Sequence, residues 1–146
     1  MPGMPLGQAL QIASSGYMSD DTADHLEIGM VVARCNMAFD REDEAAWLSC
    51  WAPNAIFHVN GKTAESTEQK LEIFRSAGRP IHHVTANSIV ELDGDTAKHE
   101  CSLVVFGTGA EGAFVRVHGY YDDSFVRTAD GWQISKRTVN LIRYSP

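Results

Sequence analysis

Residues 81–106 read IHHVTANSIVELDGDTAKHECSLVVF, and this stretch predicts two long strands joined by a tight turn. Ile81–Leu92 and Thr96–Phe106 form the strands, and Asp93-Gly94-Asp95 between them is the Asp-Gly type of turn that hairpins favour. A glycine-rich segment after this hairpin is interpreted as a link, and two more strands are expected beyond it. The link is Gly107–Gly112, and the two strands are Ala113–Arg127 and Trp132–Arg143.

The N-terminal half has the apolar spacing of helices. Over Asp21–Phe39 apolar residues recur near every third or fourth position, which predicts a long helix. Shorter helices are expected at Glu42–Cys50 and Thr63–Ala77, on either side of a short strand at Ala55–Val59. Helices followed by a meander of antiparallel strands predict an α+β domain, in which a strongly curved sheet wraps the helices. The strands alternate imperfectly, so we expect bulges and leave their inward faces open.

Length and composition are those of one globular domain. The chain has 146 residues, of which 44% are hydrophobic and 21% charged; we expect a flexible extension at 1–19 and a single domain at 20–146. No apolar run approaches the ~20 residues of a membrane span. A net charge of −7 disfavours nucleic acids and anionic membranes as partners. Three cysteines without paired spacing, and no basic leader, predict a cytoplasmic location.

Several short motifs carry a family resemblance over about 21–143. They are Phe39-Asp40, Trp51-Ala52-Pro53-Asn54-Ala55, His83 followed by Asn87, Asp93-Gly94-Asp95-Thr96-Ala97, and Gly131-Trp132-Gln133-Ile134. This set resembles the SnoaL-like branch of the NTF2-like superfamily, and within it the hexachlorocyclohexane dehydrochlorinase, scytalone dehydratase and bile-acid dehydratase group. The resemblance implies an NTF2-like, cone-shaped α+β barrel with N-terminal helices packed in a strongly curved antiparallel sheet.

The resemblance also implies a site. Asp40 and His83 match an aspartate–histidine pair that removes a proton from carbon while a leaving group departs, and Arg137 matches a pocket arginine. A neutral imidazole can take the proton and an adjacent carboxylate stabilises the imidazolium, so the chemistry requires no cofactor and no metal. Cys35 and Ile81 stand where the dehydrochlorinase has a helper lysine and a pocket cysteine. The expected ligand is therefore a small apolar molecule, but its identity does not transfer.

Five further residues are expected to contact the substrate: Asn87, Trp51, Phe57, His118 and Tyr120. Each also has a structural interpretation. An amide bond to a neighbouring strand would explain Asn87, and core packing would explain the two aromatic residues at 51 and 57. His118 and Tyr120 share one face of a strand, which is either pocket wall or solvent-exposed surface.

The proposed catalytic residues have structural alternatives too. Asp40 is placed to cap the helix that follows it, and Arg137 is equally compatible with an ion pair on the sheet surface. His82 and His83 face opposite sides of a strand, and we take His82 as the surface residue. The remaining histidines lack the spacing of metal ligands, so no metal site is expected.

Three functions remain open. The first is a cofactor-free lyase, like a dehydratase or dehydrohalogenase, with His83 as the base. The second is a ketosteroid-isomerase-like enzyme, in which Asp40 itself shuttles a proton beside a carbonyl group. The third is a non-catalytic small-ligand-binding or assembly domain, because a fold does not determine chemistry. For all three, the resemblance implies a homodimer or homotrimer.

Overall fold

The structure is a computed structural model that describes residues 20–142. The extension predicted at 1–19 lies outside the described residues. The described helices are α2 (Asp20–Asp40), α3 (Glu44–Ser49) and α4 (Thr67–Ser76). None of them has the length and apolar character needed to cross a lipid bilayer. The prediction of the long first helix is confirmed to within one residue at each end, whereas the two shorter helices begin later than expected.

Side-chain caps set where the shorter helices begin. The carboxylate of Asp43 accepts a hydrogen bond from the backbone N–H of Ala46 at 3.0 Å, so α3 starts after this residue. Ser66 and Gln69 form a capping box at the start of α4. The prediction of a helix from Thr63 is wrong for its first turn, because the preceding Asn60-Gly61 turn folds the chain back into a second strand.

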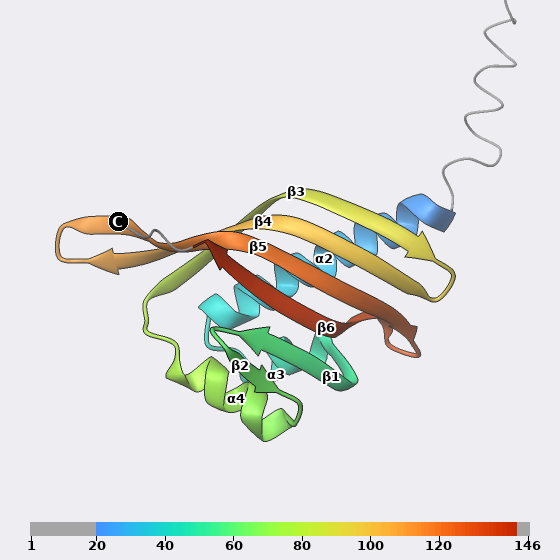
Figure 1. The fold of residues 1–146 in the computed structure, drawn as a ribbon, viewed down its shortest axis with the longest axis horizontal. Helices are drawn as coiled ribbons and strands as arrows, with labels where there is room; N and C mark the ends of the chain where they lie inside the picture. Colours follow the sequence, from blue (N-terminus) through green and yellow to red (C-terminus); the bar gives the residue numbers. More distant parts are fainter. Residues whose placement is uncertain (1–19, 143–146) are drawn as a thin grey trace, which may run out of the picture.

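The strands are β1 (Trp51–Val59), β2 (Lys62–Ala64), β3 (Ile81–Asp93), β4 (Thr96–Gly109), β5 (Gly112–Thr128) and β6 (Gly131–Ile142). They form one sheet in the order β2-β1-β6-β5-β4-β3 (Figure 1). The predicted link Gly107–Gly112 is mostly strand instead, because β4 and β5 pair as far as Gly109 and Gly112. Glycine suits Gly107 because the ring of Phe114 lies where a Cβ atom would project.

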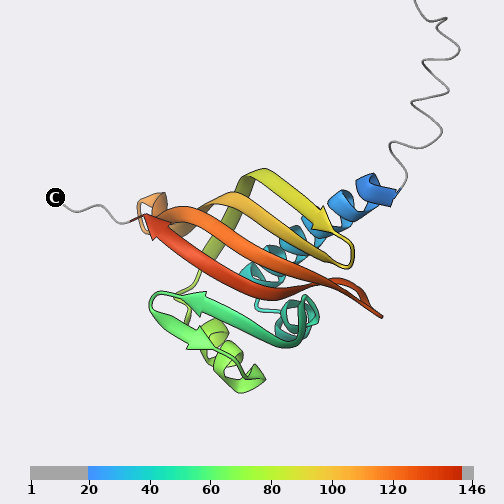
Figure 2. The same ribbon diagram turned by 45° about the vertical axis from the view of Figure 1, so that its right-hand side comes forward.

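The sheet is strongly curved and its concave side holds the helices. Figure 1 and Figure 2 show α2 running behind β3–β6, with α3 and α4 beside β1 and β2. Ile28 and Cys35 of α2 pack in one core with Phe125 and Ile134 of the sheet, and all four are almost fully buried. The sheet is mixed and open, not a closed antiparallel barrel, because β1 runs parallel to β6 and the edge strands β2 and β3 do not pair.

Bulges decide which side chains of each strand face the helices. The pairing of β3 with β4 shifts between Ala86 and Ile89, and the pairing of β5 skips Arg116. A third shift lies at Ser135 in β6. Ile134 before it faces inward, and because Ser135 is an extra residue, Arg137 faces inward too. Each extra residue reverses the inward and outward alternation beyond it. These offsets position the cavity-facing side chains of the site.

Candidate active site

Asp40 and His83 are in direct contact where α2 ends beside β3. The ring Nδ1 of His83 lies 2.5 Å from Oδ1 of Asp40, and the backbone N–H of His83 donates to Oδ2 at 2.9 Å. Their side chains are 11% and 12% exposed. Because a carboxylate accepts hydrogen bonds, Nδ1 carries the ring proton and Nε2 is left as the acceptor in neutral His83. This tautomer is the one a general base requires.

The end of α2 is held by an arginine that the sequence analysis missed. Nη1 and Nη2 of Arg79 donate to the backbone carbonyls of Phe39 and Phe74 at 2.6 and 3.3 Å. Its guanidinium also lies 5.1 Å from the centre of each of these two rings. A cation at helix C-termini satisfies unpaired carbonyls and complements the helix dipole. Asp40 is therefore the last residue of a clamped helix and not the cap of α3, which is Asp43.

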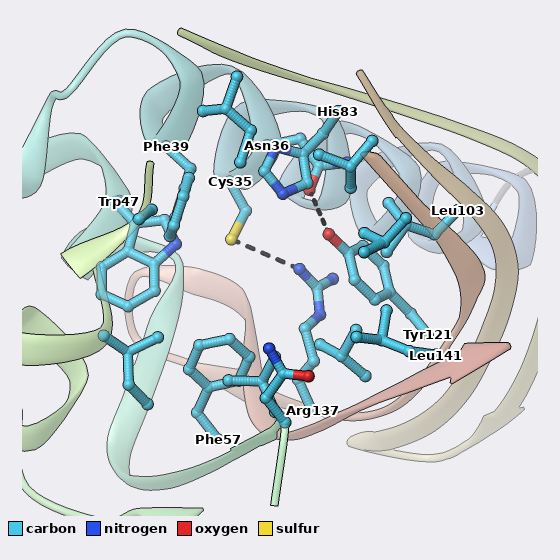
Figure 3. A pocket seen from close by; sticks show the side chains of 18 of the residues that line it. Cys35, Asn36, Phe39, Trp47, Phe57, His83, Leu103, Tyr121, Arg137 and Leu141 are labelled. Carbon is cyan, nitrogen blue, oxygen red and sulfur yellow. Dashed lines mark hydrogen bonds between the residues drawn. The ribbon is translucent and has the colours of Figure 1, made fainter. Parts of the chain in front are cut away.

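A cavity of about 320 Å³ opens beside His83 (Figure 3). Its wall is mainly apolar and includes Phe39, Trp47, Phe57, Leu103, Val105 and Leu141. In Figure 3 the His83 ring points into the same space as Tyr121 and Arg137. His83 lines the cavity, whereas Asp40 is not one of the lining residues. The histidine is thus the member of the pair that a bound molecule would meet.

Arg137 lines the cavity, but its charge is neutralised by the buried carboxylate of Asp123. Nε and Nη2 donate to the two carboxylate oxygens of Asp123 at 2.7 and 2.9 Å, and both side chains are buried. Burial opposes ionisation of Asp123, but the charge and hydrogen bonds of Arg137 hold the pKa of its carboxyl below the ordinary value. The ion pair is therefore an internal one, and not the sheet-surface pair considered from the sequence. Arg137 faces inward because the bulge at Ser135 reverses the alternation of side chains in β6.

The buried ion pair continues into a chain of hydrogen bonds. Nδ1 of His99 lies 2.9 Å from Asp123, and Nε2 of His99 lies 2.9 Å from the hydroxyl of Ser88. A serine, histidine and aspartate in this order have the connectivity of a nucleophilic triad. Here, however, Arg137 already pairs with both carboxylate oxygens, and none of the three residues lines the cavity. We assign this chain a supporting role, which is to hold Arg137 in place.

A second polar pair in the cavity was also missed. The hydroxyl of Tyr121 donates to Oδ1 of Asn36 at 2.9 Å, and both side chains are buried and line the cavity (Figure 3). Burial raises the pKa of the Tyr121 hydroxyl far above its ordinary value, so it stays a neutral donor. The sequence did contain a signal for Asn36, because it lies four residues before Asp40 and hence on the same face of the helix.

Two of the five predicted substrate contacts, Trp51 and Phe57, line the cavity. The indole Nε1 of Trp51 is the one buried side-chain nitrogen or oxygen atom that lacks a hydrogen-bond partner within residues 20–142. Asn87 does not reach the cavity. It is exposed in the β3 bulge with a φ of 56°, and its amide donates to the hydroxyl of Ser102 at 3.3 Å, as its structural interpretation proposed.

His118 and Tyr120 do not reach the cavity either. Both are exposed on the outer face of β5, because side chains alternate along this uninterrupted part of the strand and Val117 and Tyr121 face the cavity. Arg116 itself lies at the cavity rim and donates a hydrogen bond to the carbonyl of Gly78. Within the described part of the chain, no three His, Cys, Asp or Glu side chains gather closely enough to hold a metal ion.

The chain belongs to the SnoaL-like family, whose domain model matches residues 20–138. An uncharacterised protein of Mycobacterium tuberculosis is 28% identical over 126 residues, which cover 80% of this chain and 84% of that protein. An NTF2-like protein with a cystatin-like fold from Novosphingobium aromaticivorans has a TM-score of 0.77 at 23% identity, over 98% of this chain and 94% of the other. LinA has a TM-score of 0.76 at 20% identity, over 87% and 91% of the two chains. The predicted family and NTF2-like fold are confirmed.

Proposed function

We propose that this protein is a cofactor-free lyase that acts on a small, largely apolar molecule. The observation that carries the proposal is the 2.5 Å contact between His83 and Asp40 at the wall of a mainly apolar cavity. A histidine is suited to proton transfer near neutral pH. Its partner carboxylate favours the charged imidazolium, and the low dielectric of an apolar cavity strengthens that interaction.

In the proposed reaction, Nε2 of His83 removes a proton from a carbon atom of the substrate. The electron pair of the broken C–H bond forms a carbon–carbon double bond, and the leaving group departs from the neighbouring carbon with its own bonding pair. Asp40 stabilises the imidazolium while the proton resides there. When the leaving group is hydroxide, return of the proton from His83 releases water and restores the neutral base.

The geometry supports His83 as the base in preference to Asp40. Both carboxylate oxygens of Asp40 accept hydrogen bonds from His83, and Asp40 does not line the cavity. A ketosteroid-isomerase-like reaction would need the carboxylate itself to reach the substrate. It would be supported if His83→Ala kept its activity while Asp40→Ala lost it.

Elimination from a panel of cyclic β-hydroxy and β-halo ketones tests the proposal, because the conjugated product is followed by its ultraviolet absorbance. On any compound that is turned over, His83→Ala should lower kcat by about 10²-fold or more. His118→Ala is the matched control, since this histidine is exposed on the outer face of β5 and does not line the cavity, so its loss should leave the rate unchanged. Wild-type turnover by His83→Ala would refute the assignment of the base.

We further propose that the protein acts as a homodimer or homotrimer in the cytoplasm. Leu26, Met30 and Met37 are exposed along α2, and a row of exposed apolar side chains is typical of a surface that another protein covers. The three cysteines are free and buried, which fits a reducing compartment. Light scattering coupled to size-exclusion chromatography measures the mass directly, and a monomer at micromolar concentration would contradict the oligomer.

A further inference from the structure

We infer that the substrate carries a neutral oxygen atom that accepts a hydrogen bond from the side-chain amide of Asn36, and that Tyr121 holds this amide in place. This inference rests on the proposed function and narrows its substrate class to alcohols and ketones. Asn36 would contact the substrate directly, whereas Tyr121 would be a positioning residue.

The orientation of the Asn36 amide follows from its one hydrogen bond. Oδ1 accepts the hydroxyl proton of Tyr121 at 2.9 Å, so the opposite end of the amide presents the two N–H donors of Nδ2. Within residues 20–142 this nitrogen donates no hydrogen bond to another residue. If it were also sealed from solvent, it would count among the buried polar atoms without a partner, and it does not. Nδ2 is therefore accessible, and because Asn36 is buried in the cavity wall, the access is from the cavity.

Asn36 lies about one helical turn before Asp40, the partner of the proposed base. Asn36 precedes Asp40 by four residues on α2, which separates their backbones by about 6 Å along the helix axis. Figure 3 shows the His83 ring, the Asn36 amide and the Tyr121 hydroxyl around one space. A molecule bound in this cavity would place an oxygen at Asn36 and a neighbouring C–H group at Nε2 of His83, since both residues line it.

The other polar groups of the cavity explain why a neutral oxygen is favoured over an anionic group. Arg137 is a bidentate partner of Asp123, so its charge is already compensated. The Cys35 thiol beside it has its pKa raised by a hydrogen bond with Cys50 and by burial, and it remains neutral. A neutral amide donor suits a carbonyl or hydroxyl oxygen, and its hydrogen bond strengthens as that oxygen gains negative charge during proton removal.

Binding of two probes with one carbon skeleton tests the inference without any turnover. The ketone α-tetralone offers an acceptor oxygen, and the hydrocarbon tetralin does not. Isothermal titration calorimetry measures the affinity of each variant for both probes. The ratio of the two affinities cancels any change in apolar packing that affects both probes equally. In Asn36→Leu the preference for the ketone should fall about fivefold to tenfold relative to wild type, as expected for one buried hydrogen bond. Asn140→Leu, a β6 residue that does not line the cavity, should keep the wild-type ratio.

Tyr121→Phe provides an independent measurement if Asn36→Leu folds poorly. It removes the hydroxyl that orients the amide, so affinity for α-tetralone should fall while affinity for tetralin stays at the wild-type value. A merely structural role would weaken both probes equally. The inference is overturned if the ketone preference of either folded variant equals that of wild type. His83→Ala should keep the preference, so a failure of the proposed catalytic base is distinguishable from a failure of the oxygen-binding site.

Discussion

Asp40 contacts His83 through both of its carboxylate oxygens, one on the ring Nδ1 at 2.5 Å and one on the backbone N–H at 2.9 Å. The second bond matters as much as the first, because it ties the carboxylate to the strand that carries the imidazole. The end of a helix and the start of a strand are thereby locked together, 43 residues apart in the chain. The contact predicts a definite tautomer of the neutral ring.

Neutral His83 should carry its proton on Nδ1 in the wild-type protein. Asp40→Asn should increase the population with the proton on Nε2, because an amide can donate to Nδ1 where a carboxylate cannot. Long-range proton–nitrogen NMR spectra distinguish the two tautomers. Asp43→Asn is the control, since Asp43 only caps α3. A wild-type ring protonated mainly on Nε2 would contradict the geometry that we describe.

Asp123→Asn should destabilise the fold by about 3–5 kcal/mol, because it leaves the buried guanidinium of Arg137 without its counter-charge. Urea unfolding measures the loss. Asp122→Asn makes the same chemical change one residue earlier, on the exposed side of β5, and should alter the free energy of unfolding by about 0.5 kcal/mol or less. Equal effects of the two substitutions would show that the ion pair contributes nothing.

Protonation of Asp123 should lower the stability of the fold in acid. The pKa of Asp123 is held below its ordinary value of 3.8 by Arg137, against the opposing effect of burial. A depressed carboxyl pKa stabilises the fold fully above pH 3.8 and loses this contribution as the pH falls through the folded-state value. Thermal unfolding followed between about pH 5 and pH 2 should therefore show a shallower decline in Tm for Asp123→Asn than for wild type. Parallel profiles would contradict this assignment.

Arg79→Met should loosen the end of α2 and disturb the contact between Asp40 and His83. The substitution removes the donors to the carbonyls of Phe39 and Phe74, which should cost about 1–3 kcal/mol of stability. The NMR signals of the His83 ring should broaden or shift, because Asp40 follows Phe39 directly. Arg75→Met is the control: Arg75 pairs with Glu44 on the surface, so neither stability nor the His83 signals should change. Unaltered His83 signals in Arg79→Met would show that Arg79 does not hold the end of α2 in place.

Much of the local structure was predictable because its causes are local. Apolar spacing indicated the helix of residues 20–40, and the Asp-Gly turn indicated the hairpin of β3 and β4. The family motifs predicted that Asp40 and His83 form a pair, and the two residues are in contact in the structure. Arg79 and Tyr121 were missed, since an arginine in a loop or a tyrosine in a strand has no distinguishing local pattern. Asn36 was missed although its position four residues before Asp40 places it on the same face of the helix.

The sequence by itself determined where the helices and most strands lie, which family the chain belongs to and which two residues form the pair. Only the tertiary structure decided that Arg137 is a buried partner of Asp123 and that His118 and Tyr120 face outward. The reason is the register of the sheet. One extra residue in a ladder turns every later side chain to the opposite face, and whether a residue is extra depends on the partner strand.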